Sequence, residues 1–154
     1  MESSVEKALR PVKEILPHRE PFLFLDEVIE MTDSTVVATR TVRADEPQFQ
    51  GHYPGRPIMP GVLLCETILQ CGAYLMAVKL GEDASMKGAP VVARMNSVKF
   101  KRMVQPGDVL RVEAEHVRTI KDAHMMKGRI RRDDTLVASL DFTVTLVDDS
   151  KAGG

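Results

Sequence analysis

The residues best suited to chemistry are a histidine in a loop and a glutamate on an apolar helix. His52 lies in QGHYPGRPIMPG, where six Gly and Pro residues disfavour helix and strand alike. In the following segment, PGVLLCETILQ, Glu66 and Gln70 are one helical turn apart and therefore share a helix face. An imidazole can accept a proton near neutral pH, and a carboxyl group can donate one. Together these residue types indicate acid–base catalysis.

Residues 60–80 predict a helix that is apolar on nearly every side. Pro60 suits its first turn and Gly81 its end, and only four polar residues interrupt it. Such a helix is either buried or membrane-spanning, and the cost of a carboxylate in mid-membrane favours burial. A buried Glu66 must be paired or protonated, or it must face a cavity or an interface. A structural glutamate that bonds a neighbouring loop amide is the alternative to a catalytic one.

The rest of the chain predicts antiparallel strands. Turn residues at Pro106-Gly107-Asp108 and Asp133-Asp134 give connections so short that they join only antiparallel neighbours. In the last run, apolar residues from Leu136 to Leu146 alternate with a more polar set, which predicts one core-facing side. One apolar helix and about six strands predict an α+β fold, in which a curled antiparallel sheet wraps around the helix. The expected strands span residues 22–31, 35–42, 91–102, 109–119, 124–132 and 135–147.

Three segments together resemble a known enzyme family. The stretch QGHYPGRPIMPGVLLCETILQ resembles the catalytic loop and helix of the FabZ family of 3-hydroxyacyl-[acyl-carrier-protein] dehydratases. ILPHREPFLFLDEV resembles the family's opening segment, and NSVKFKRMVQPGDVL resembles its strand that leads into a Pro-Gly-Asp turn. The resemblance covers roughly residues 15 to 110 and implies one hot-dog domain over residues 1–154. It implies a lyase of fatty acid biosynthesis that dehydrates 3-hydroxyacyl thioesters.

The resemblance also implies roles for particular residues. His52 matches the catalytic histidine and Glu66 the catalytic acid, and the two would come from different subunits of a dimer. Gly61 matches the glycine whose backbone N–H binds the thioester carbonyl, and we expect Val62 and Gln70 to bind substrate beside it. Dehydration removes a proton from C2 and hydroxide from C3, so it requires a base and an acid. The family also suggests a trimer of dimers, and no cofactor or metal is expected.

Charge is unevenly distributed along the chain. The net charge is −1, but residues 94–132 hold eleven basic and four acidic residues, a net +7. Such a segment is either a solvated sheet face or a docking surface for an anionic partner. The acyl carrier protein is acidic in the pathway of the FabZ family, so Lys101 and Arg102 are the first candidates for carrier-protein docking.

The cysteines and the opening segment indicate a cytosolic protein. Cys65 and Cys71 both fall in the apolar helix, as small buried thiols of a reducing compartment would. The first residues, MESSVEKALRPVKEIL, show no signal-peptide pattern. His18, His116 and His124 do not cluster with the cysteines in the sequence, so we expect no metal site.

Two other functions fit the same fold. A hot-dog acyl-thioesterase would use a helix carboxylate without requiring His52 in this loop. A non-catalytic acyl-thioester binding subunit would keep the pocket but would have no use for His52, Gly61 and Glu66 together. One fold hosts unrelated functions, so both alternatives remain open at this point.

Overall fold

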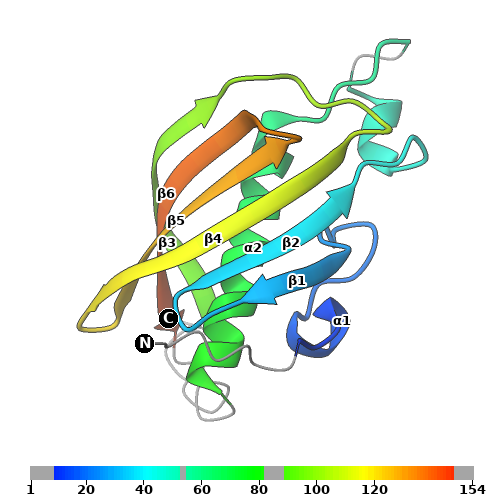
Figure 1. Cartoon of the computed structure of the whole chain (residues 1–154). Coiled ribbons are helices and arrows are strands. Elements are labelled where there is room, and N and C mark those ends of the chain that lie inside the picture. Colours follow the sequence, from blue (N-terminus) through cyan, green and yellow to red (C-terminus); the bar gives the residue numbers. More distant parts are fainter. Residues whose placement is uncertain (1–8, 53–54, 82–88, 148–154) are drawn as a thin grey trace.

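The computed structural model describes residues 9–52, 55–81 and 89–147 (Figure 1). A short helix and a hairpin come first, then a 3-10 turn, one long helix and four long strands. The elements are α1 (Val12–Ile15), β1 (Glu27–Met31), β2 (Thr35–Thr41), η1 (Pro47–Gln50), α2 (Gly61–Leu80), β3 (Ala89–Phe100), β4 (Val109–Ile120), β5 (Ala123–Arg132) and β6 (Thr135–Val147).

The six strands form one antiparallel sheet in the order β1-β2-β4-β5-β6-β3. The sheet curls around α2, which lies against its concave face (Figure 1). A short turn joins β5 to β6, as Asp133-Asp134 predicts, and another joins β4 to β5. The prediction that Pro106-Gly107-Asp108 joins neighbouring strands is wrong: these residues lie between β3 and β4, which β5 and β6 separate in the sheet, because the chain from Phe100 to Val109 is long enough to cross the end of the sheet. The long connection through α2 carries the chain to β3 at the far edge. The predicted curled sheet around a central helix is therefore confirmed.

Helix α2 forms the centre of the core. Ile68, Cys71 and Leu75 have no exposed surface, and a Cβ on Gly128 of β5 would clash with Cγ2 of Ile68. Only a glycine lets the sheet approach the helix this closely. By length and composition α2 could cross a membrane, but 56% of its most apolar window is buried inside the fold. Helix α2 is therefore a buried core helix, as the sequence analysis favours, rather than a membrane span.

The first strand begins later than the sequence predicts. Residues 22–31 read as one strand, but β1 starts at Glu27. At Phe22 and Phe24 the backbone bonds to a side chain of α2 instead of a neighbouring strand: the N–H of Phe24 donates to Oε1 of Gln70, and Nε2 of Gln70 donates to the carbonyl of Phe22. Because these main-chain groups already have partners, the segment lies across the helix rather than in the sheet.

At the start of β6 the predicted alternation of core-facing residues is wrong, because the strand contains a bulge. Ala138 pairs with Ile130 and Leu136 pairs with Arg131, so Val137 is the extra residue of β6. Val137 is buried in place of Leu136, whose side chain lies on the outer face of the sheet. From Ala138 to Val144 the predicted core-facing residues are buried. Residues 146 and 147 end the strand, and their side chains lie outside the described part of the structure.

Candidate active site

His52 lies between η1 and α2, in a loop that fixes its imidazole. The His52 N–H donates to the carbonyl of Gln48 at 3.2 Å, and Nδ1 lies 2.6 Å from the carbonyl oxygen of Ile58. A carbonyl oxygen can only accept a hydrogen bond, so Nδ1 of a neutral imidazole carries the hydrogen and Nε2 carries the lone pair. The loop therefore holds His52 in the tautomer whose Nε2 can act as a base.

A buried ion pair anchors the start of this loop. Arg40 of β2 is 1% exposed and Glu46 is 7% exposed, and Nη1 of Arg40 donates to Oε2 of Glu46 at 3.0 Å. Glu46 also accepts from the N–H of Arg43 at 2.6 Å and from Nε2 of Gln48 at 3.0 Å. Burial raises the pKa of Glu46, but the bonds from Arg40, Arg43 and Gln48 outweigh burial and hold the pKa below its ordinary value. Because Gln48 also binds the His52 N–H, the pair fixes the path of the chain toward His52.

Glu66 lies on the second turn of α2 with two polar side chains against one of its oxygens. Nε2 of Gln70 donates to Oε2 of Glu66 at 3.1 Å. Nε2 of His18 lies 3.7 Å from the same oxygen, and the two side chains are 25% and 23% exposed. The carboxyl group is therefore only partly in contact with solvent, as a group that exchanges a proton with a bound substrate would be.

Gln70 is fixed in one orientation beneath Glu66. Its side chain has no exposed surface in the single chain. The N–H of Phe24 can only donate, so it identifies the amide oxygen, and Nε2 then donates to both the Phe22 carbonyl and Glu66. These contacts give Gln70 a positioning role toward Glu66, whereas its expected role in substrate binding stays a prediction.

The N-terminus of α2 presents backbone donors. The N-cap residue Pro60 gives no side-chain hydrogen bond, and the N–H groups of Leu63 and Leu64 bond to its carbonyl. The N–H groups of Gly61 and Val62 precede these and have no acceptor within the helix. A Cβ on Gly61 would lie 3.0 Å from Cζ of Phe100, so glycine permits this close packing. The site can therefore bind an oxygen that gains negative charge at the positive end of the helix dipole.

Within one chain, His52 and Glu66 each interact with a separate set of residues. Among the described residues, the hydrogen bonds and ion pairs of His52 and Glu66 go to different partners. The residue that the sequence reasoning missed is His18, which the fold brings to Glu66. The available signal was the segment ILPHREPFLFLDEV, in which this histidine lies four residues before Phe22, whose carbonyl bonds to Gln70.

The other two histidines belong to a separate cluster. Nζ of Lys79 lies 2.7 Å from Nδ1 of His116, and Thr119 Oγ1 lies 2.8 Å from His116 and 2.9 Å from His124. Burial and the charge of Lys79 lower the pKa of both imidazoles. Lys79 is about 20 Å along α2 from Glu66 at the helical rise per residue, so this cluster is no part of the candidate site.

Comparison with known sequences agrees with the geometry. The family model described as "FabA-like domain" matches residues 16–141. Curated relatives called "3-hydroxyacyl-[acyl-carrier-protein] dehydratase FabZ" include one from Clostridium perfringens, which is 46% identical over 71% of this chain and 77% of the relative. Another, from Symbiobacterium thermophilum, is 41% identical over 88% of this chain and 94% of the relative. The chain therefore belongs to the FabA-like family and, within it, to the FabZ group of dehydratases.

Solved structures agree on the fold. The dehydratase heterocomplex ApeI:P from Xenorhabdus doucetiae superposes with a TM-score of 0.78 at 18% identity, covering 92% of this chain and 94% of that chain. A hypothetical thioesterase from Streptococcus pneumoniae, solved with coenzyme A, gives a TM-score of 0.62 at 19% identity, covering 79% and 85%. At such identities the likeness shows the hot-dog fold alone, and dehydratases and thioesterases share it.

Removing Arg40 tests the anchor of the His52 loop. Arg40→Met should lower the free energy of unfolding by about 3 to 5 kcal/mol, because it leaves Glu46 buried without its counter-charge. Chemical denaturation at several pH values measures this loss. The folded-state pKa of Glu46 is lowered, so its stabilising contribution is present above its unfolded pKa and is lost as the pH falls through the folded pKa. The difference between wild type and variant should therefore narrow on acidification.

The matched control is the exposed pair Arg10–Glu14, whose two side chains are each 56% exposed. Arg10→Met should cost at most about 1 kcal/mol. Equal losses for Arg40→Met and Arg10→Met, or a difference that does not change with pH, would show that the buried pair does not anchor the loop.

Proposed function

We propose that this chain catalyses the reversible dehydration of 3-hydroxyacyl-[acyl-carrier-protein] to trans-2-enoyl-[acyl-carrier-protein], as a hydro-lyase of fatty acid biosynthesis. The relatives over most of the chain support this substrate. The observation that carries the reaction type is the 2.6 Å contact from Nδ1 of His52 to the Ile58 carbonyl, which sets Nε2 as a base. A thioesterase that relies on the helix carboxylate has no need of this arrangement.

The reaction follows from three groups. Nε2 of His52 removes the proton from C2, and Glu66 protonates the hydroxyl on C3, which leaves as water as the C2–C3 double bond forms. The N–H of Gly61 stabilises the thioester oxygen while negative charge builds up on it. His52 then releases its proton to water and Glu66 takes one up, which restores both groups. Val62, at the same helix end and 74% exposed, is placed to contact the acyl chain.

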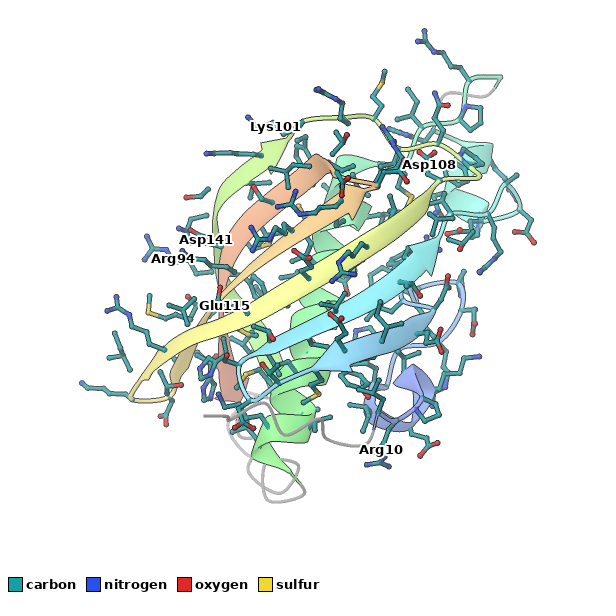
Figure 2. The ribbon with its side chains drawn as sticks, in the orientation of Figure 1. Arg10, Arg94, Lys101, Asp108, Glu115 and Asp141 are labelled. Carbon is teal, nitrogen blue, oxygen red and sulfur yellow. The ribbon has the colours of Figure 1, made fainter. Side chains whose placement is uncertain are left out.

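We propose that His52 and Glu66 meet across a dimer interface at β3. This strand forms one edge of the sheet, and all its described side chains, residues 91–100, are exposed in the single chain. Figure 2 shows Arg94 projecting outward at this edge. A long edge with apolar side chains is a template for pairing with a second chain. The exposed apolar residues of the strand are Val91, Val92, Met95, Val98 and Phe100.

The dimer proposal predicts the mass in solution. Light scattering on the eluting wild-type protein should give at least twice the mass of one chain, and a trimer of dimers would give six times that mass. Met95→Lys should yield monomers, because it places a charge on the pairing strand. Ile29→Lys, on the opposite edge strand β1, is the matched control and should leave the mass unchanged. A monomeric wild type, or a Met95→Lys variant of unchanged mass, would refute the interface.

The carrier protein would dock beside the end of β3. Arg111, Arg129 and Arg132, which contribute to the basic segment, are paired with Glu113 or Asp108. Lys101 and Arg102 form no ion pair among the described residues, and their backbone N–H groups are held by the carbonyl of Val137. Lys101 lies at the end of the molecule where α2 begins (Figures 1 and 2). These two cations therefore suit an acidic carrier that delivers its acyl group to Gly61.

The proposal also places the enzyme in the cytosol as one catalytic domain over residues 1–154. Support comes from α2, which is buried as the core helix and contacts both halves of the sheet. The two cysteines on this helix are buried free thiols, which fits a reducing compartment.

An assay with crotonyl thioesters of the carrier protein and of coenzyme A tests the function. Wild type should remove the enoyl absorbance by hydration without releasing free thiol. His52→Ala and Glu66→Gln should each lower the rate by about 10²-fold or more, because each removes a proton-transfer group. His116→Gln and Glu14→Gln are the matched controls and should retain wild-type rates.

Two other outcomes would contradict the proposal. Thiol release that depends on Glu66 but not on His52 would identify a thioesterase. If neither the enoyl absorbance falls nor free thiol is released, with the carrier-protein thioester and with the coenzyme A thioester, the chain is a non-catalytic acyl-thioester binding subunit.

A further inference from the structure

A third titratable side chain, His18, belongs to the candidate site. Its Nε2 lies 3.7 Å from Oε2 of Glu66, and its ring stacks on Phe22 with centroids 6.3 Å apart and planes inclined by 20°. The contact is longer than a hydrogen bond, but catalytic contacts in unliganded enzymes are often long and shorten when substrate binds. His18 enters from the opening segment, independently of the loop that holds His52.

The surroundings of the two ring nitrogens indicate the tautomer of His18. Nδ1 is buried and has no hydrogen-bond partner among the described residues. A neutral imidazole carries one hydrogen. On Nδ1 that hydrogen would be a buried donor without an acceptor, and the lone pair of Nε2 would face the oxygen of Glu66. With the hydrogen on Nε2, Nδ1 is still buried without a partner, but the hydrogen points toward the oxygen of Glu66, so the contact at Nε2 favours the Nε2–H tautomer.

Two donors therefore converge on one oxygen of Glu66. The amide of Gln70 is oriented by Phe24 and Phe22, so its Nε2 donates to Oε2 at 3.1 Å. His18 directs its Nε2–H at the same atom. An oxygen that accepts from Gln70 and faces a second donor at 3.7 Å is a poor place for the acid proton of Glu66, which leaves Oε1 to carry it.

We propose that His18 is a positioning residue that, together with Gln70, holds Oε2 of Glu66 so that Oε1 carries the proton transferred to the leaving hydroxyl. The inference rests on the proposed dehydratase function. In that step the Oε1–H bond breaks, the proton joins the C3 hydroxyl to form water, and the electron pair stays on the carboxylate. His18 then donates to the carboxylate that has formed, so its contribution is largest when the proton has left.

Two substitutions separate the donor of His18 from its bulk. His18→Phe keeps a ring that can stack on Phe22 but has no donor, whereas the amide nitrogen of His18→Gln can replace Nε2–H. With a 3-hydroxybutyryl thioester, followed in the direction of dehydration, His18→Phe should lower kcat about tenfold with KM nearly unchanged, because the lost interaction strengthens only as Glu66 gives up its proton. His18→Gln should restore most of kcat. Circular dichroism would establish that both variants are folded.

A spectroscopic measurement determines the tautomer of His18 independently of enzyme activity. Nitrogen-15 NMR of the wild-type protein at neutral pH should show His18 protonated on Nε2 and bare on Nδ1, with His18→Gln used to assign the signal. A hydrogen on Nδ1, or equal kcat losses in His18→Phe and His18→Gln, would overturn the inference. An active wild type with a fully active His18→Phe variant would overturn this inference alone. An inactive wild type would overturn the proposed function together with it.

Discussion

The arrangement of the site depends on a carboxyl group placed on a helix that the sheet otherwise buries. Taking Glu66 largely out of water is costly unless hydrogen-bond donors replace the water. Gln70 supplies one donor, but a buried amide needs partners of its own, and Phe22 and Phe24 provide them through their backbone. This requirement explains why the opening segment crosses α2 instead of joining the sheet. The same path of the chain brings His18 to Glu66.

The base is positioned by an independent buried interaction. The pair between Arg40 and Glu46 fixes the chain that leads into η1, and the Ile58 carbonyl then sets the imidazole of His52. The acid and the base are therefore held by separate networks, each supported by buried groups. Reacting groups supported in this way keep their geometry during the reaction. Such separation also suits a site whose two halves come from different subunits.

Sequence periodicity predicted most of the fold because it reports burial directly. The helix and the strands β2, β4, β5 and β6 lie within about one or two residues of their expected bounds, the usual uncertainty of an element end. Phe22 to Asp26 were assigned wrongly to a strand, since strand-forming residues cannot reveal a partner such as Gln70, 46 residues further along. Likewise Val137 is buried instead of Leu136 because of a bulge, and a bulge is a property of the pairing between strands that one strand's sequence does not show.

The candidate site was predictable only in part, for the same reason. The types and spacing of His52, Gly61 and Glu66 were enough to predict acid–base catalysis and to show the resemblance to the FabZ family. The supporting residues did not stand out, because Arg40, Glu46 and His18 become interpretable only when the fold brings each to its partner.

The central claim is that one chain supplies His52 and the other supplies Glu66. Mixing His52→Ala with Glu66→Gln, after unfolding and refolding the two together, tests it directly. In half of the randomly formed dimers one of the two sites regains both residues, so the mixture should recover up to about a quarter of wild-type hydratase activity. Each variant refolded alone should stay inactive. An inactive mixture that native mass spectrometry shows to contain mixed dimers would mean that both residues act within one chain, and would contradict the account.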